Sequence, residues 1–156
     1  MKGLTVIALC ALALGAAGCG GGSGERLSKA AYQSQLAKIA QQAKADQSAI
    51  AQAAATSKTV AQLQDAVRKF ADAGARFGDE LAKLKPPANA DAANTALVKG
   101  ERDNAAETRA VVPTLSNYKT VQQALGYLQS HGPTQGGAEI QAALAKLKQL
   151  GYTTGS

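Results

Sequence analysis

The chain has 156 residues, enough for one domain, with a formal net charge of +6 and 35 alanines. Aromatic residues make up 4% and tryptophan is absent, whereas strands favour β-branched and aromatic side chains. The composition therefore excludes a β-rich fold and, because 46% of the residues are hydrophobic, a disordered chain; it predicts helices built from alanine, glutamine, lysine and leucine.

The first 18 residues have the layout of a secretory signal peptide. A short basic start contains Lys2, an apolar run follows over residues 4–14, and small residues lead to Cys19. The apolar run is too short to cross a membrane as a helix. We therefore expect residues 1–18 to be removed and the protein to be exported.

The segment Ala16-Ala17-Gly18-Cys19 resembles the lipobox of bacterial lipoproteins, in which signal peptidase II cuts before the cysteine. The resemblance implies cleavage between Gly18 and Cys19, and a diacylglyceryl group with fatty acids such as palmitate on Cys19. It also implies anchoring to the outer face of a bacterial cell membrane or to the cell envelope. Ala16 departs from the leucine that is common in that family. Residues 19–24, rich in glycine, would then be the lipidated cysteine and its flexible tether.

Lipidation would leave no free thiol in the mature chain. Cys10 lies in the segment that is removed and Cys19 would carry the lipid, so neither a disulfide nor a thiol metal site is expected. The alternative is that Cys19 is a buried thiol and the apolar run an internal helix. The mature chain is still mildly basic, which favours an anionic lipid surface close to the anchor.

Residues 25–152 are predicted to form a single helical-bundle domain whose first helix follows Ser28. Serine is a favoured N-cap, and apolar residues recur after it at spacings of three and four. This helix should end near Ala55. Asp46 falls on its apolar face and interrupts it.

The second predicted helix, residues 58–85, has the most regular pattern in the chain. Apolar residues or glycine recur along it at steps of three and four, and Pro86-Pro87 ends it. On another face an acid precedes a base by four residues three times, in Asp65–Lys69, Asp72–Arg76 and Asp79–Lys83. We interpret these charges as a solvated face whose acids and bases neutralise each other; the alternative is a basic stripe for phosphate groups.

The third predicted helix begins at Asn89 or Asp91 and carries the weakest apolar stripe. Pro113 either kinks this helix or ends it. The segment from Tyr118 to Leu128 is accordingly either a continuation or a separate short helix.

The C-terminal part is predicted to contain a loop, a last helix and a tail. Glycine and proline over residues 131–137 favour a loop. The last helix should stop at Leu150, with Gly151 in the C′ position where glycine is common. Residues 153–156 are expected to be a flexible tail.

The predicted fold class is all-α, an antiparallel up-down helical bundle of four helices, or of five if Pro113 ends the third. Amphipathic helices of similar length joined by short loops pack in this way. Gly74 and Gly100 lie on apolar faces, where a missing side chain allows helices to approach closely. We expect both glycines to be helix contacts rather than parts of ligand loops.

Three short pieces of the chain are similar to a loose group of small alanine-rich bacterial lipoproteins of uncharacterised function. They are Leu27–Tyr32 after the tether, Leu84–Ala88 at the central turn and Leu150–Tyr152 near the end. Each piece is a cap or a helix stop. The resemblance therefore implies a helical lipoprotein and brings no catalytic residue with it.

No motif in the sequence points to catalysis, a metal or a cofactor. A metal site recruits several His, Cys or carboxylate ligands, and His131 is the one histidine. Neither a nucleophile elbow nor a phosphate-binding glycine loop is present. Acids are interleaved with the bases along the same helices, so nucleic-acid binding is not expected. We predict a protein that is not an enzyme and needs no cofactor.

Two functions remain open from the sequence. The first is a lipid-anchored, non-enzymatic surface protein that binds or organises another envelope component. The second is a small-ligand-binding or sensor bundle with a polar pocket lined by Asp46, Asn104 and Tyr32, because polar residues on apolar faces need partners. The structural alternative to such a pocket is that Asp46 pairs across the bundle with Arg109 or Asn104 and fixes how the helices align.

Overall fold

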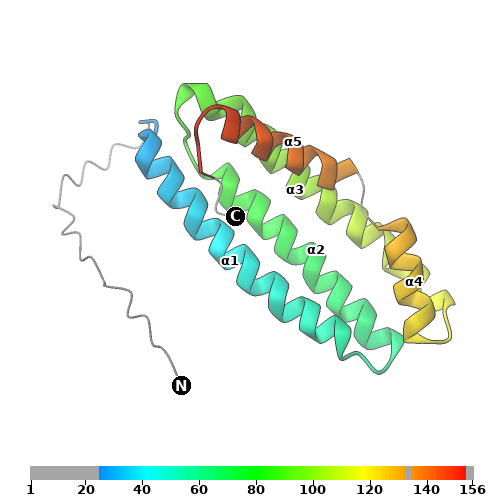
Figure 1. The fold of residues 1–156 in the computed structure, drawn as a ribbon. Helices are drawn as coiled ribbons and strands as arrows, with labels where there is room; N and C mark the ends of the chain where they lie inside the picture. The colour runs from blue at the N-terminus through cyan, green and yellow to red at the C-terminus, as the bar shows by residue number, and fades with distance from the viewer. Residues whose placement is uncertain (1–24, 133–134, 154–156) are drawn as a thin grey trace, which may run out of the picture.

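The computed structural model describes residues 25–132 and 135–153, which form five α-helices (Figure 1). These are α1 (Lys29–Ala55), α2 (Val60–Ala82), α3 (Asp91–Val111), α4 (Val121–His131) and α5 (Gln135–Gln149); the 3₁₀ helices η1 (Ala88–Ala90) and η2 (Pro113–Asn117) flank α3. The described residues contain no strand, which confirms the prediction of an all-α helical bundle.

The predicted signal peptide, the predicted lipidation site Cys19 with its predicted tether, and the end of the predicted tail lie outside the described residues. Within the described ranges, every helix is too short or too polar to cross a bilayer. The prediction of a lipid anchor at Cys19 is therefore not tested by the described residues.

Serine and threonine side chains define where three of the helices begin. Ser28, Thr59 and Thr120 each accept a hydrogen bond from the backbone N–H three residues further on, at 3.2, 3.2 and 3.3 Å. An N-cap of this kind satisfies one of the free N–H groups of the first turn. The predicted first helix, with its Ser28 cap and its end at Ala55, is confirmed.

α2 is shorter at both ends than the predicted span of 58–85. It begins after the Thr59 cap and ends at Ala82. The residue before a proline disfavours the α conformation, so Lys85 cannot be helical and the chain leaves the helix before it. The Lys85 carbonyl instead accepts a hydrogen bond of 2.7 Å from the N–H of Leu27, which fixes the N-terminal segment to this loop.

Pro113 ends the third helix rather than kinking it. η2 follows it directly, and α4 is a separate helix. The predicted loop over 131–137 is too long, because α5 already begins at Gln135 and includes both glycines that suggested a loop. A Cβ on Gly136 would overlap the backbone of Asn104, so this glycine lets α5 lie against α3 at a distance that a side chain would prevent.

The long helices lie side by side in the order α1, α2, α3, α5 (Figure 1). α2 and α3 are antiparallel, since the Asp79–Arg102 and Asp72–Arg109 ion pairs join them at 2.9 and 2.8 Å. α3 and α5 are also antiparallel. A Cβ on Gly100 would lie 2.9 Å from the Ile140 backbone nitrogen, which confirms Gly100 as a helix contact.

One of the three predicted i,i+4 ion pairs forms, Asp65–Lys69 at 2.8 Å. The predicted pairs Asp72–Arg76 and Asp79–Lys83 are wrong. α3 lies beside that face of α2, and Arg109 and Arg102 of α3 pair with Asp72 and Asp79 instead. Arg76 pairs with Asp46 of α1 at 3.1 Å, and Lys83 pairs with Glu80 at 2.6 Å. The charged face therefore joins α2 to its neighbours, although such exposed pairs contribute at most about 1 kcal/mol each.

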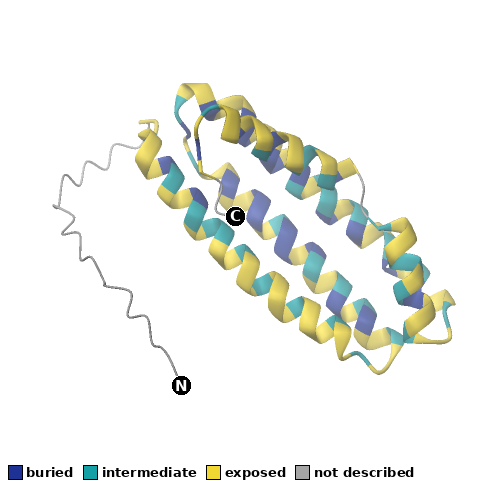
Figure 2. Cartoon of the chain, viewed as in Figure 1, coloured by how far each residue is buried: buried dark blue, intermediate teal, exposed yellow. Residues whose placement is uncertain are grey.

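Buried residues concentrate on α2 and α3, as Figure 2 shows by the dark blue segments along both helices. α1 is different. It has 27 residues, yet only Tyr32 and Leu36 in its first part are buried. The rest of its inner face is half-buried at most, so most of α1 contributes no fully buried side chain to the hydrophobic core.

Candidate functional site: an apolar groove between α1 and α5

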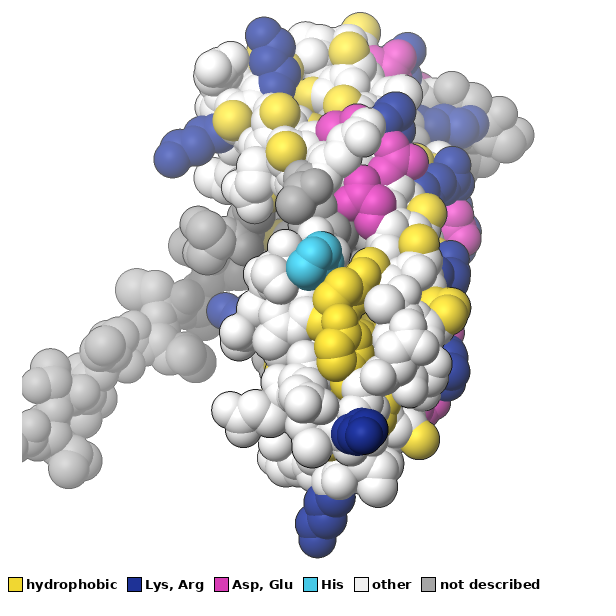
Figure 3. Space-filling model, turned by 90° about the vertical axis from the view of Figure 1, so that its right-hand side faces the viewer, with side chains coloured by type: hydrophobic (Ala, Val, Ile, Leu, Met, Phe, Trp, Pro, Cys, Tyr) yellow, Lys and Arg dark blue, Asp and Glu magenta, His cyan; other side chains and the backbone are white. Residues whose placement is uncertain are grey.

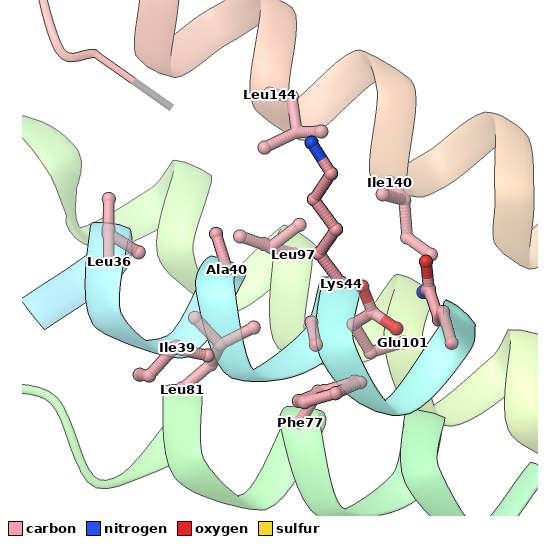
Figure 4. A pocket seen from close by; sticks show the side chains of 12 residues that line it. Leu36, Ile39, Ala40, Lys44, Phe77, Leu81, Leu97, Glu101, Ile140 and Leu144 are labelled. Carbon is pink, nitrogen blue, oxygen red and sulfur yellow. The ribbon is translucent and has the colours of Figure 1, made fainter. Parts of the chain in front are cut away.

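A groove runs between α1 and α5 above a floor formed by α2 and α3 (Figure 4). Its volume is about 370 Å³, at the small end of the range of about 300–1,000 Å³ that is typical of small-molecule pockets. The apolar side chains that line this groove come from all four helices and are Leu36, Ile39, Ala40, Ala43, Phe77, Leu81, Leu97, Ile140 and Leu144.

The groove exists because α1 presents alanine where a closed bundle needs larger side chains. Ala40 and Ala43 face the groove, and a methyl group does not reach across to α5. Ile140 and Leu144 on the α5 side consequently stay half-buried. The helices thus leave an apolar surface open that a row of leucines would have filled.

Three polar side chains also face this space: Lys44 and Gln47 of α1 and Glu101 of α3. In Figure 4 the Glu101 carboxyl group points into the groove, while the Lys44 side chain extends across the mouth towards Leu144. Within the described part of the chain, Glu101 forms no hydrogen bond or ion pair. Burial without a partner raises the pKa of Glu101 to about 7, because the charged form loses its hydration.

Beyond Gln47, the space under α1 continues as a second cavity of about 410 Å³. It lies among α1, α2, α3 and α4, and its lining is almost entirely apolar, with Ile50, Phe70 and Leu128 among the side chains. The polar group of Lys44, Gln47 and Glu101 therefore separates two apolar regions.

A tyrosine cluster (Tyr32, Asn89, Asn94 and Tyr152) closes the end of the groove where α1 begins. The Tyr32 hydroxyl donates to Asn94 Oδ1 at 2.9 Å, and Asn94 Nδ2 donates to a backbone carbonyl of α2 at 3.2 Å. The Tyr152 hydroxyl donates to Asn89 Oδ1 at 2.8 Å, and the two tyrosine rings meet edge to face with centroids 5.5 Å apart. Burial raises the pKa of Tyr32 to about 12.

The turn after α5 places Tyr152 in this cluster. Gly151 has a φ of +75°, and the N–H groups of Gly151 and Tyr152 bond to the carbonyls of Lys148 and Leu147 at 2.9 and 3.0 Å. These two bonds define a Schellman motif, which needs a left-handed residue at C′. The sequence prediction for Gly151 is therefore confirmed.

The structure does not bring together the three residues of the predicted polar pocket. Tyr32 belongs to the tyrosine cluster, and Asp46 lies 14 positions further along α1, which is about 21 Å at 1.5 Å per residue. Asn104 is half-buried against Gly136 of α5. These positions rule out one pocket lined by all three.

The predicted pairing of Asp46 with Arg109 or Asn104 is also wrong. Asp46 pairs with Arg76 of α2, because α1 lies beside α2 and not beside the far end of α3. Arg109 is bound to Asp72 at 2.8 Å. A polar residue on the α1 face thus joins neighbouring helices at the surface.

Sequence analysis did not single out Glu101. Glu101 follows Leu97 by four residues and precedes Ala105 by four, and both neighbours are buried. Residues spaced by four share one face of a helix. That spacing is the signal that places a carboxyl group on the buried side of α3.

A smaller aromatic surface lies on α4, where Figure 3 shows hydrophobic side chains beside the histidine. The Tyr127 ring stacks on His131 with centroids 4.5 Å apart, and Tyr118 lies 5.5 Å from Tyr127. His131 is exposed, and the described residues contain no group of three His, Cys, Asp or Glu side chains that could hold a metal. This surface offers aromatic stacking, and His131 Nδ1 lies 2.9 Å from the Ser130 hydroxyl oxygen.

Comparison of the chain with family models, with curated proteins and with solved structures found no match. The functional inference therefore depends on the residues of the groove. Its lining contains no serine, cysteine or histidine, whereas it offers an apolar surface with one half-buried carboxyl group. Such a surface is suited to binding.

Proposed function

We propose that the protein is an exported, lipid-anchored, non-enzymatic binding module of the bacterial cell envelope, and that the groove between α1 and α5 is its binding site. The observation that carries this proposal is the open apolar volume of about 370 Å³ under α1. Apolar surface left open in this way is characteristic of binding sites in soluble domains. The groove takes the place of the polar pocket expected around Asp46.

The loose packing of α1 supports a binding role. Only its first turns are anchored in the core, and the half-buried stretch from Ile39 onwards lies over the groove. Segments with few buried apolar contacts are those that move most readily. A ligand entering beneath α1 would gain apolar contacts with Ile39, Ile140 and Leu144 that the free protein lacks.

The binding function is tested by photolabelling the full-length protein in phosphatidylcholine vesicles with an alkyl diazirine. Labelled peptides, identified by mass spectrometry, are expected from α1 residues 36–47 and α5 residues 140–144. Ala40→Phe fills the groove and should reduce this labelling several-fold. Ala45→Phe, on the exposed side of α1, is the matched control and should leave it unchanged. Equal labelling of the groove peptides in the wild type and in Ala40→Phe would contradict the proposal.

The lipid anchor is tested separately at Cys19. Cells supplied with a radioactive or clickable fatty acid should incorporate it into the wild-type protein. Cys19→Ala should abolish incorporation and leave the precursor uncut. Continued labelling of Cys19→Ala would refute the anchor.

A further inference from the structure

The groove is long and narrow. Its α1 wall runs from Leu36 to Gln47, about 16 Å at 1.5 Å per residue. The groove has a volume of about 370 Å³ along that length and is lined mainly by apolar side chains. These dimensions suit an extended alkyl chain.

The groove also has a negative group with no protein partner. The Glu101 carboxyl group is half-buried among apolar side chains. The nearby cations of α3 are already occupied: Arg102 pairs with Asp79, and Lys99 bridges two acids. An ion pair formed in this half-buried space would be screened less by water and salt than one on the open surface.

Lys44 is the other charged group that lines the groove, and it has a different position. Its side chain is exposed on α1, and Figure 4 shows its ammonium group directed towards Leu144 and away from Glu101. A lysine at a groove mouth can move its charge into solvent at small cost, because its four-carbon stem is flexible. Lys44 therefore leaves Glu101 available to a ligand.

From this arrangement we infer that the groove selects elongated amphiphiles carrying an amine or ammonium group, with the alkyl chain along the apolar walls and the cation paired with Glu101. This inference rests on the proposed binding function and adds the chemical class of the ligand. An anionic amphiphile would instead place its charge beside an uncompensated carboxylate. A neutral one, such as an alcohol, could donate a hydrogen bond to the carboxylate but would bring no opposite charge.

The test uses three photoreactive probes with the same diazirine-bearing dodecyl chain, ending in an amine, an alcohol or a carboxylic acid. Full-length protein in phosphatidylcholine vesicles is labelled at pH 8, and the yield on groove peptides is measured for the wild type and for Glu101→Gln. The ratio of the two yields, taken for each probe, cancels differences in partitioning into the lipid. Glu80→Gln, an exposed acid on α2, is the matched control.

We expect a wild-type to Glu101→Gln ratio of about 5–10 for the amine, corresponding to roughly 1–1.4 kcal/mol, about one for the alcohol and below one for the acid. Glu80→Gln should give a ratio near one with every probe. Lys44→Ala should preserve or increase labelling by the amine. Circular dichroism on each variant shows that the helices are intact.

The outcomes separate this inference from the proposed function. Labelling that Ala40→Phe blocks, but with equal ratios for all three probes, would overturn cation selection and leave the binding function standing. A preference for the acid that disappears in Lys44→Ala would also overturn it, since the head group would then be bound by Lys44. Labelling that Ala40→Phe blocks for none of the probes would overturn both.

Discussion

The two halves of α1 are packed in opposite ways. At its start, Tyr32 is fully buried and its hydroxyl donates a hydrogen bond to Asn94, which is also buried. From Ile39 onwards, the same helix lies over an open groove whose one carboxyl group, that of Glu101, has no partner within the described part of the chain. A single helix thus contacts a buried hydrogen-bonded cluster at its start and a partly exposed apolar groove further along.

This contrast shows how a protein poor in aromatic residues divides its stability. The cluster uses two of the four tyrosines, and aromatic side chains bury the largest apolar area. Alanines line α1 above the groove, and each buries little. Along α1, burial is therefore concentrated at the tyrosine cluster, while the groove stays open.

The largest expected effect is at Tyr32. Tyr32→Ala should lower the free energy of unfolding by about 3–5 kcal/mol, since it empties a buried aromatic site and leaves Asn94 unpaired. Ile39→Ala in the groove should cost about 1 kcal/mol because its side chain is half exposed already. Urea denaturation followed by circular dichroism measures both. Equal losses would break the contrast between the two halves.

Gly136→Ala tests how the close contact of α5 with α3 contributes to stability. The added methyl group would overlap the Asn104 backbone, so we expect a loss of about 1–3 kcal/mol as α5 is pushed away from α3. Gly126→Ala in α4 is the control, because its added methyl group meets nothing within 4 Å. It should gain about 0.5–1 kcal/mol from helix propensity. Thermal melts of the two variants should shift in opposite directions.

Glu101→Gln tests the electrostatics of the groove. The pKa of Glu101 is raised from 4.5 to about 7 in the folded protein, so the folded state binds this proton more tightly than the unfolded state. The associated stability is present below about pH 4.5 and is lost as the pH rises through 7. Glu101→Gln should therefore be more stable than the wild type at pH 8, by about 1–2 kcal/mol, and nearly equal at pH 4. A difference independent of pH would be inconsistent with a desolvated carboxyl group.

The smallest expected effect is at the surface ion pairs. Asp72→Asn removes the partner of Arg109 on a half-exposed face and should cost less than about 1 kcal/mol. The loss should disappear in 1 M salt, where the Debye length is about 3 Å. Melting temperatures at low and high salt measure it. A loss that persists in salt would show that the pair contributes through packing.

Sequence reasoning succeeded where the determinants are local. The Ser28 cap, the Gly151 turn and the helix periods depend on residues within a few positions of one another. It failed where distant segments meet. Asp46 and Glu101 both lie on helix faces, and their roles depend on which helix lies opposite and how closely it approaches.

The groove could not be predicted for the same reason. It depends on the separation of α1 from α5, which small residues on three helices set together. Ala40 on α1 leaves the space open, whereas Gly100 and Gly136 draw α5 towards α3 and away from α1. A small residue on a helix face is compatible with close packing, as at Gly100, and with an open space, as at Ala40. The sequence alone does not distinguish the two.

The pairing of α2 with α3 has a consequence for the order of folding. These helices are consecutive in the chain, and Asp79 and Arg102, which join them, are 23 residues apart. Contacts of short sequence separation form fastest, since closing a short loop costs little entropy. We expect this hairpin to form the folding nucleus and α1, of which only Tyr32 and Leu36 are buried, to dock afterwards. Substitutions on the α1 wall of the groove should then speed unfolding and leave the folding rate nearly unchanged, as stopped-flow chevron plots can measure.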